Sequence, residues 1–386
     1  MDTETMNKLR NREEQKLHAD ASAYSFSDET KMMLYSSITV LLSSFALLPR
    51  MALGFVPFWS HAGQRFPPLA DQQEHHYLST HVNHQEQNGN ILVSDEHLDH
   101  DYVVPDTAKT HSSGTAQVHE AFRKCEATGQ GVGDNVMIKM SPNVNAMKRE
   151  VENTERVSEQ DDENVIINIL DHNIPPGPDD CSPDTCMIVM EKGCEDLVSY
   201  MNENSDMMTG GKLRNTIYSI VSGIDSIHAS GLVWCDAKLS NFVVQQNGNI
   251  VKAIDLESCV TPGSQPRKFT PSTCPPEFLY IIEACLRGEP ESVRHCVDHS
   301  FDIWSIGIIA FTLITRQSFF HDNLDPICVV DTLASIDQHA IDYDERLNGD
   351  GMQVDLLAKD FILKCLKVNP SERPSTRQLL QHPFLL

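Results

Sequence analysis

Regular patterns of hydrophobic and polar residues begin near residue 104 and continue to the end of the chain. The clearest pattern lies between residues 212 and 230, where apolar side chains recur every three or four positions and predict an amphipathic helix. Gly231 follows directly, as is typical of a residue that ends a helix. No internal repeat is visible, so the pattern indicates a globular region and not a repeat array.

Short apolar runs on either side of this helix predict strands. Residues 242–244 and 250–254 are joined by the polar turn Asn247-Gly248-Asn249 and predict a β-hairpin. Upstream, residues 136–140 predict a strand, and residues 145–157 predict a helix with a charged face. We therefore expect strands and helices to be mixed in this region.

A different apolar stretch lies near the N-terminus. Residues 1–31 are a polar leader, and residues 32–59 form a hydrophobic segment that carries no charge between Met33 and Leu48. This uncharged part is shorter than the roughly 20 residues of a spanning helix. It favours a signal peptide cleaved after Ala52-Leu53-Gly54, or a signal anchor, over a short buried helix packed on the rest of the protein.

We therefore expect membrane association through residues 33–59, or secretory or plastid targeting, with a cytoplasmic location as the alternative. The Gly54-Phe55-Val56-Pro57 junction resembles the bipartite plastid leaders of algae with secondary plastids. Residues 60–103 are rich in His, Gln, Asn and Asp, and this composition predicts a disordered tether and not an ordered metal site.

Composition narrows the functional classes. The 386-residue chain has a formal net charge of −25, so its surface as a whole is not suited to binding a nucleic acid. Its eleven cysteines include no C-x-x-C pair, and their odd number argues against a disulfide-stapled scaffold. We expect reduced, mostly buried thiols and no nucleic-acid partner.

Four polar residues near the predicted hairpin could carry chemistry. Asp236, Lys238 and Asn241 precede its first strand, and Asp255 follows its second. Phosphoryl transfer needs a carboxylate that orients the attacking hydroxyl and a cation on the transferring phosphate. It also needs an amide oxygen and a second carboxylate that hold magnesium. These residue types occur here in that order.

Five motifs make the sequence resemble the eukaryotic protein kinases. Trp-Cys-Asp-Ala-Lys-Leu-Ser-Asn at 234–241 resembles the catalytic loop H-R-D-x-K-x-x-N, and Asp-Leu-Glu at 255–257 resembles D-F-G. Residues 274–277 resemble A-P-E, residues 302–307 resemble D-x-W-S-x-G, and residues 369–374 match the family's last helical stretch. An isolated D-x-K-x-x-N would usually be a solvated loop, but here the other motifs fall in register with it.

The resemblance implies a kinase domain over residues 104–386 with the two-lobed α+β protein-kinase fold. The small β-rich lobe would cover 104–190, and the mainly helical lobe would cover 194–386. The implied activity is transfer of the ATP γ-phosphate to Ser or Thr hydroxyls of a protein substrate, with ATP and Mg²⁺ as cofactors. We expect the protein to be a monomer.

The resemblance also assigns roles to single residues. Asp236 would orient the substrate hydroxyl and accept its proton, Lys238 and Lys139 would neutralise phosphate charge, and Asn241 and Asp255 would hold the metal. The helix glutamate that pairs with the strand lysine most resembles Glu150, with Glu152 and Glu155 as alternatives.

Further positions would contact the nucleotide. In the resemblance they are Val118 after the glycine-rich loop, Met137 on the lysine strand, Glu191 and Gly193 in the hinge, and Val243 beside the catalytic loop.

The framework positions follow from the same resemblance. Glu277 would form a buried bidentate pair with Arg373, and Asp302 would accept hydrogen bonds from the catalytic-loop backbone. These roles are structural.

The glycine-rich loop departs from the family pattern. By position it should be residues 111–118, where only the valine matches, and Met137 replaces the alanine that normally meets adenine. Residues 129–133 contain Gly-x-Gly-x-Gly but lie too close to Lys139, and they predict a strand-connecting turn. These departures keep open the alternative of a pseudokinase that acts as a nucleotide-binding or scaffold module.

The catalytic motifs depart as well. Cys235 replaces the arginine that receives an activation-loop phosphate, so control by that charge pair is not expected. Trp234 replaces histidine and should fill the same internal column, and Leu256-Glu257 replaces Phe-Gly. The hydroxyl residues of the activation segment remain unranked as phosphorylation sites: Thr261, Ser264, Thr270, Ser272 and Thr273.

Overall fold

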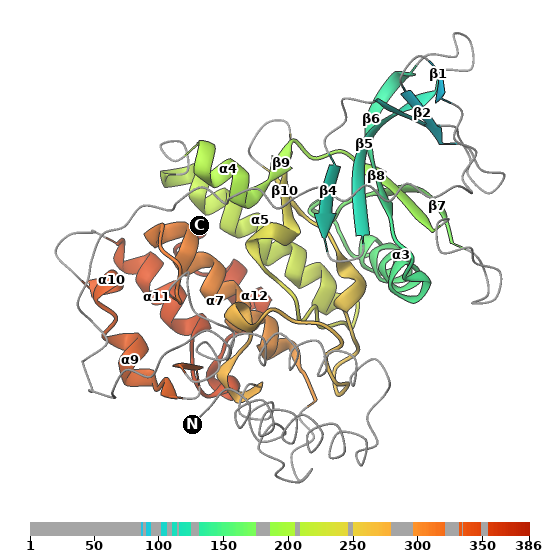
Figure 1. The fold of residues 1–386 in the computed structure, drawn as a ribbon. Helices are drawn as coiled ribbons and strands as arrows, with labels where there is room; N and C mark the ends of the chain where they lie inside the picture. Colours follow the sequence, from blue (N-terminus) through green and yellow to red (C-terminus); the bar gives the residue numbers. More distant parts are fainter. Residues whose placement is uncertain are drawn as a thin grey trace, which may run out of the picture. The chain divides into compact units, whose positions relative to one another are not determined.

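A mostly antiparallel sheet and a group of helices make up the described part of the chain (Figure 1). The computed structural model describes residues 86–87, 90–93, 102–105, 110–113, 116–124, 131–174, 186–204, 209–245, 250–278, 296–320, 332–333, 335–348 and 354–386. All of them belong to the second of two units of the chain, residues 80–386. The predicted leader and the hydrophobic segment 32–59 lie outside the described residues.

The larger sheet has eight strands in the order β1-β2-β3-β5-β6-β8-β7, and β4 pairs with β5. The strands are β1 (Glu86–Gln87), β2 (Asn90–Val93), β3 (Tyr102–Pro105), β4 (Thr110–Ser113), β5 (Ala116–Lys124), β6 (Gly131–Met140), β7 (Ile169–Asn173) and β8 (Met187–Glu191). Every neighbouring pair is antiparallel.

Two sequence predictions in this sheet need correction. Strands β1 and β2 and the start of β3 lie within residues 60–103, which we expected to be disordered, because β3 continues the sheet along β5 through Tyr102 and Val103. Gly131 and Gly133 lie in strand β6 and not in a turn. Gly131 pairs with Lys124 next to a register shift, a place where a glycine's lack of a side chain accommodates a bulge.

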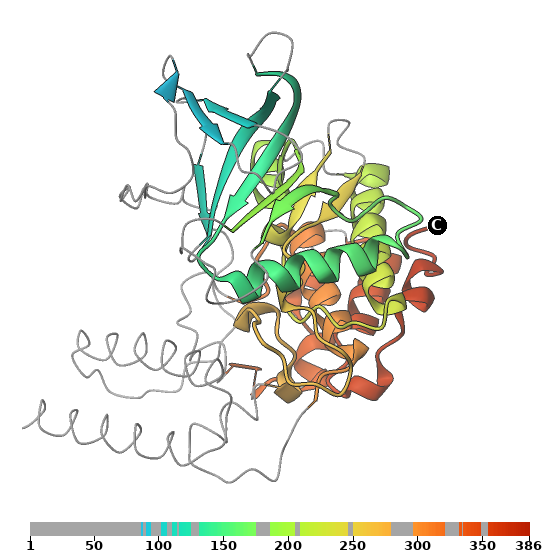
Figure 2. The ribbon, with the colours of Figure 1, turned by 90° about the vertical axis from the view of Figure 1, so that its right-hand side faces the viewer.

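Helix α3 (Val144–Ser158) packs between the sheet and the helical part of the chain (Figure 2). Its N-cap Asn143 accepts a hydrogen bond from the backbone of Ala146 at 3.1 Å. Its buried residues recur at spacings of one, three and four, so a single face meets the protein: Ala146, Met147, Glu150, Val151, Thr154 and Val157. Glu150 is the one carboxylate on that buried face.

The second lobe is mainly helical. Its helices are α4 (Leu197–Glu203), α5 (Gly210–Ala229), α7 (His299–Thr315), α9 (Gln338–Asp342), α10 (Glu345–Asn348), α11 (Leu356–Cys365) and α12 (Thr376–Leu380). The predicted amphipathic helix is α5, and Gly231 directly after it has the left-handed φ of 75° that ends a helix at low cost. A small sheet joins β9 (Glu195–Asp196), β10 (Phe242–Val244) and β11 (Val251–Ala253), so the predicted hairpin is confirmed.

The main hydrophobic core lies in this helical lobe and extends to the catalytic loop. Helix α7 is buried along nearly its whole length because its sequence is apolar on all sides. Trp234 and Trp304 are fully buried in this core. Together, the antiparallel sheet and the helical lobe confirm the two-lobed α+β fold.

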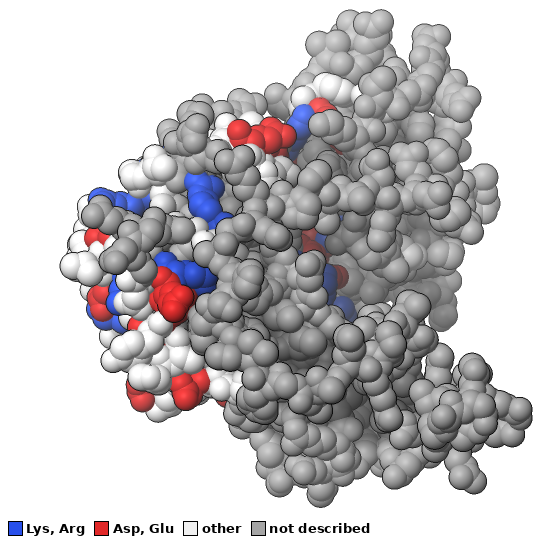
Figure 3. Space-filling model, turned by 60° about the vertical axis from the view of Figure 1, so that its left-hand side comes forward, with Lys and Arg blue, Asp and Glu red and all other residues white. Residues whose placement is uncertain are grey.

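The surface carries both signs of charge. On the described part of the face drawn in Figure 3, Lys and Arg lie interspersed with Asp and Glu. Within the described residues, none of the helices combines the length and the apolar character needed to cross a membrane.

Candidate active site

Asp302 in α7 holds the backbone of the catalytic loop through hydrogen bonds. Its carboxylate accepts hydrogen bonds from the backbone N–H groups of Trp234 at 2.7 Å and Cys235 at 2.9 Å. His228 lies 2.9 Å from the same carboxylate through Nε2. The predicted framework role of Asp302 is thus confirmed, and it fixes the direction in which Asp236 leaves the loop.

Cys235 holds the loop in a strained shape. Its φ of 66° is left-handed, a conformation that costs a non-glycine residue about 1–3 kcal/mol and persists only where the surroundings enforce it. Its thiol is buried, and burial raises the pKa of that thiol well above its ordinary value. A buried neutral thiol cannot form an ion pair with a phosphate on the activation segment. Control by that charge pair is therefore not expected at this position.

Trp234 fills the interior as expected. The indole ring meets Phe242 edge to face, with 5.3 Å between the ring centroids. Its Nε1 donates a hydrogen bond to the backbone oxygen of Asp255 at 3.3 Å. The ring therefore connects the catalytic loop with the start of the activation segment.

Asp236 lies at the centre of a polar cluster. Lys238 Nζ is 3.0 Å from Asp236 Oδ2, and Asn241 Nδ2 donates to the Asp236 backbone oxygen at 2.9 Å. Thr270 donates its hydroxyl to Asp236 Oδ1 at 2.6 Å and accepts a hydrogen bond from Lys238 at 3.1 Å. The structure thus brings together the three residues that the sequence grouped and adds Thr270.

Lys139 joins the two lobes. Its Nζ lies 2.6 Å from Glu150 Oε2 and 2.9 Å from Asp255 Oδ1. Glu150 is therefore the partner of the lysine, whereas Glu152 and Glu155 are exposed. Helical phase decides this choice, because only Glu150 shares the buried face of α3.

These contacts shift the ionisation of the carboxylates. Burial alone would raise the pKa of Asp255, but the nearby ammonium groups of Lys139 and Lys268 outweigh burial and lower the pKa to about 2. Burial raises the pKa of Glu150 to about 7, although Lys139 opposes the shift. Asp255 is thus kept as an anion, which is the form that binds a cation.

The segment that begins at Asp255 is held to helix α3. Asp255 has a left-handed φ of 64°, and Leu256 is fully buried in the core. Asn153 of α3 donates its side-chain amide to the backbone oxygen of Leu256 at 2.8 Å. The apolar contact expected of Leu256 is present, and α3 holds the backbone of this residue in place.

The residues expected to meet a nucleotide lie on facing elements. Val118 in β5 pairs with Lys139 in β6, and Met137 pairs with Met190 in β8. Met137 and Val243 are both partly buried against one hydrophobic cluster of the small lobe.

The hinge runs close to this cluster. A Cβ on Gly193 would lie 2.8 Å from the Cβ of Val243, so only glycine allows this approach. The Glu191 side chain accepts a hydrogen bond from buried Lys252 at 2.6 Å, and its backbone N–H donates to the Asn168 backbone oxygen at 3.0 Å.

The donor atoms near Asp255 fit a magnesium ion. The side-chain nitrogen of Asn241 is used by the Asp236 backbone oxygen, which leaves the amide oxygen as the atom for a cation. Among the described residues, no group of three or more His, Cys, Asp or Glu side chains could hold a metal by itself. One carboxylate and one amide suit Mg²⁺, because this ion usually takes its other ligands from phosphate and water.

The predicted pair between Glu277 and Arg373 is confirmed. Both guanidinium NH groups lie 2.7 Å from the two carboxylate oxygens. The Arg373 side chain is fully buried, and its guanidinium lies over the Trp304 ring at 5.2 Å from the centroid. This pair joins the end of the activation segment to the C-terminal part of the lobe.

Sequence reasoning missed three residues at the site. Lys268 lies 3.4 Å from Asp255 and 2.5 Å from Glu257, and Thr270 contacts Asp236. We named Thr270 only as a phosphorylation candidate and Glu257 only as a departure from the family pattern. No local pattern marks Lys268, because the chain must fold back over 13 residues to bring it to Asp255.

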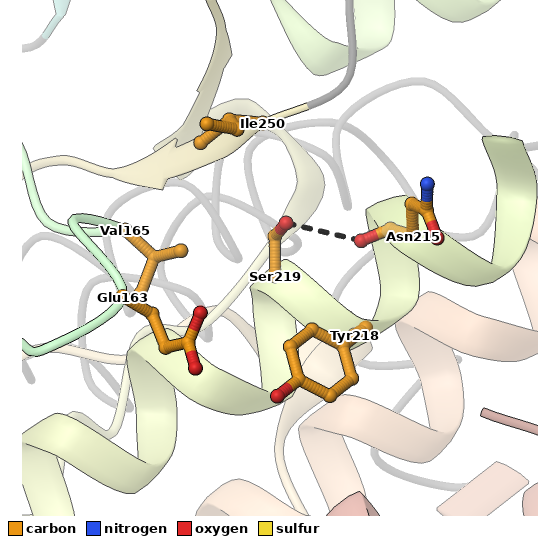
Figure 4. A pocket seen from close by; sticks show the side chains of 6 residues that line it. All are labelled: Glu163, Val165, Asn215, Tyr218, Ser219 and Ile250. Atoms are coloured by element: carbon orange, nitrogen blue, oxygen red, sulfur yellow. Dashed lines mark hydrogen bonds between the residues drawn. The ribbon is translucent and has the colours of Figure 1, made fainter. Parts of the chain in front are cut away.

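A separate pocket lies away from this cluster (Figure 4). It is formed by the segment after α3, by helix α5 and by the residue before β11, and it is lined by Glu163, Val165, Asn215, Tyr218, Ser219 and Ile250. None of the residues predicted for catalysis or nucleotide binding lines it.

Comparison with known proteins agrees with the geometry. Residues 128–385 match the family described as "Protein kinase domain". The chain is 31% identical over 190 residues to "Mitogen-activated protein kinase kinase kinase 1" of Arabidopsis thaliana, covering 45% of this chain and 26% of that protein. It is 28% identical over 182 residues to "Serine/threonine-protein kinase shk1/pak1" of Schizosaccharomyces pombe, covering 47% and 25%.

A third relative is covered more fully. The chain is 25% identical over 226 residues to "Serine/threonine-protein kinase pim-2" of Danio rerio, covering 57% of this chain and 61% of that protein. By contrast, the matched region spans about a quarter of the Arabidopsis and fission-yeast relatives. The match to the protein kinase family covers well over half of this chain and includes every site residue from Lys139 to Thr270. The chain therefore belongs to the protein kinase family.

Proposed function

We propose that this protein transfers the γ-phosphate of ATP to Ser or Thr hydroxyls of a protein substrate. Two contact groups carry the proposal: Lys139 lies 2.9 Å from Asp255, and Lys238 and Asn241 lie 3.0 and 2.9 Å from Asp236. A chain that only served as a scaffold would not need to keep all five residue types or these contacts between them.

The proposed transfer uses the cluster as follows. The substrate hydroxyl oxygen forms a bond to the γ-phosphorus while the bond between that phosphorus and the β–γ bridging oxygen breaks. Asp236 orients the hydroxyl and takes its proton, and it must exchange the Thr270 hydroxyl or share its carboxylate with the substrate. Lys238 and Lys139 supply positive charge to the transferring and the bound phosphates.

Asn241 and Asp255 would hold the metal. When bound, Mg²⁺ neutralises charge on the phosphate oxygens. The carboxylate of Asp255 is kept ionised by its lysine neighbours, and the ionised carboxylate is the form that binds a cation.

The activation segment contacts the site through its own side chains. Cys235 offers no positive charge, whereas Thr270 and Lys268 contact Asp236 and Asp255 directly. We infer that phosphorylation of the segment is not required to assemble the site.

The alternative is a pseudokinase that binds nucleotide without transferring phosphate. Met137 carries this candidate, because its side chain takes the position where the family has a small alanine against adenine. Its side chain is partly buried against the small-lobe cluster.

Phosphate transfer by the full-length chain decides between these functions. Radiolabelled γ-phosphate should pass to a generic basic protein with the wild-type chain, fall by at least about a hundredfold in Asp236→Asn, and be unchanged in the exposed control Asp162→Asn. Equal counts in wild type and Asp236→Asn would overturn the kinase proposal. Stabilisation of the wild-type chain by Mg-ATP without transfer would favour the pseudokinase.

We further propose that residues 32–59 act as a signal or anchor segment. N-terminal sequencing of the native protein should find a start after Gly54 if the segment is cleaved. An intact N-terminus together with extraction in the membrane fraction would indicate an anchor, and recovery of the intact chain in the soluble fraction would overturn both.

A further inference from the structure

The activation segment returns a lysine to the cation site. Lys268 Nζ lies 3.4 Å from Asp255 Oδ2, and Lys139 Nζ lies 2.9 Å from the other oxygen, Oδ1. Both oxygens of the carboxylate that would hold Mg²⁺ therefore already face an ammonium group. The Lys139 contact leaves Oδ2 as the atom for the metal, and that is the atom that Lys268 faces.

Glu257 gives this lysine a second partner. Its Oε1 lies 2.5 Å from Lys268 Nζ, whereas Asp255 Oδ2 lies 3.4 Å from the same nitrogen. In the D-F-G motif that Asp255–Glu257 resembles, this position is glycine and has no side chain. Glu257 therefore places a negative side chain beside the metal ligand, and its charge balances that of Lys268.

A metal ion at Asp255 conflicts with the observed position of Lys268. A cation on Oδ2 would lie next to an ammonium group in a partly buried site, where like charges repel strongly. Lys268 must then withdraw, and Glu257 allows it to withdraw without losing its charge partner. The side chains of Lys268 and Glu257 are 39% and 19% exposed, so there is room for the lysine to turn outward.

We propose that Lys268 is an internal cation that competes with Mg²⁺ for Asp255, and that Glu257 holds the lysine in its withdrawn position. The pair would set the concentration of Mg²⁺ at which the site fills. The proposal rests on the proposed function only in assigning Asp255 as a metal ligand.

The charge state of Lys268 supports this competition. A lysine ammonium loses its proton only well above neutral pH, and Lys268 faces the two carboxylates of Asp255 and Glu257. The lysine is therefore a cation throughout the physiological range, and withdrawal does not depend on loss of a proton.

Metal binding by the full-length chain tests the proposal. Mn²⁺ is the probe, titrated in the presence of a non-hydrolysable ATP analogue and followed by the electron paramagnetic resonance signal of free Mn²⁺. Lys268→Gln should tighten Mn²⁺ binding on the order of tenfold, and Glu257→Gln should weaken it by a similar factor. Lys268→Arg keeps the positive charge and should stay close to the wild type.

The double variant separates contact from a general field effect. If the two charges act only through space, Glu257→Gln weakens Mn²⁺ binding equally with and without Lys268. If Glu257 acts by holding Lys268, then Glu257→Gln changes binding by less than about twofold in the Lys268→Gln background. Thermal unfolding of each variant shows that it is folded.

The outcomes are distinguishable from those of the kinase proposal. Additive effects, or shifts in the same direction for both single variants, would overturn the competition, and so would absence of Mn²⁺ binding in both the wild type and Lys268→Gln. A chain that binds Mn²⁺ with the expected pattern but transfers no phosphate would sink the kinase activity and leave the role of Lys268 standing.

Discussion

The buried pair between Glu277 and Arg373 offers a quantitative test of the framework. Replacing Glu277 by Gln keeps the shape of the side chain and removes its charge. The Arg373 guanidinium would stay fully buried beside a neutral amide. The NH₂ group of that amide would face an N–H group of the guanidinium, so two donors would meet. The remaining partners of Arg373 are backbone oxygens: those of Lys367, Ser300 and Val368.

The magnitude follows from burial. Breaking a fully buried ion pair costs about 3–5 kcal/mol. The Glu277 side chain is 25% exposed and Gln can still accept one hydrogen bond, so we expect about 2–3 kcal/mol for Glu277→Gln. For a domain of this size, that corresponds to a fall in melting temperature of about 5–10 °C.

The matched control is the same chemical change on the surface. Glu152 lies 3.9 Å from Lys148 with both side chains more than half exposed, so Glu152→Gln should cost at most about 0.5 kcal/mol. Thermal unfolding of the three full-length chains by far-ultraviolet circular dichroism measures both effects. Added salt should reduce the small effect at Glu152 and leave the large effect at Glu277 nearly unchanged.

One result would refute the reasoning. If the melting temperatures of Glu277→Gln and Glu152→Gln differ by less than about 1 °C, the buried pair contributes no more than an exposed one.

Two further predictions concern helix α7. Gly307→Ala should destabilise the chain by about 1–2 kcal/mol, because the new Cβ would lie 2.6 Å from Leu366 Cδ2 and the overpacking outweighs the gain in helix propensity. Gly211→Ala, which meets nothing within 4 Å, should instead be neutral or slightly stabilising; equal melting temperatures for these two variants would contradict the argument. Burial lowers the pKa of His299 below 6.5, so the unfolded chain binds the proton more readily and stability falls as the pH drops through 6.5. His299→Gln should flatten this loss in melting curves recorded at about pH 7.5 and pH 5.5, and an unchanged slope would remove His299 as its source.

Local sequence was sufficient for several of the elements and for the core of the candidate site. Asp236, Lys238 and Asn241 lie within six residues, so a single loop shape brings them together. Asp255 follows a hairpin whose two strands are evident from their apolar runs. Helix α5 was evident because its buried face repeats with the helical period.

Tertiary structure decided the contacts that no local pattern encodes. Three glutamates in one predicted helix could have met Lys139, and packing of a single face of α3 selected Glu150. Strands β1 and β2 were missed because they are short and lie within residues 60–103, a segment rich in polar residues. The sheet reaches them only through β3, which lies along β5.

The activation segment shows the division most clearly. The sequence of the catalytic loop identified Cys235 as unable to form an ion pair with a phosphate on the activation segment, since this depends only on the type of residue at the position. Only the folded path of the chain placed Lys268 beside Asp255 and Thr270 beside Asp236, because contacts between residues 13 and 34 positions apart depend on how the intervening backbone packs. The sequence by itself therefore determined which groups are available for chemistry, and the tertiary structure decided which charges those groups must share.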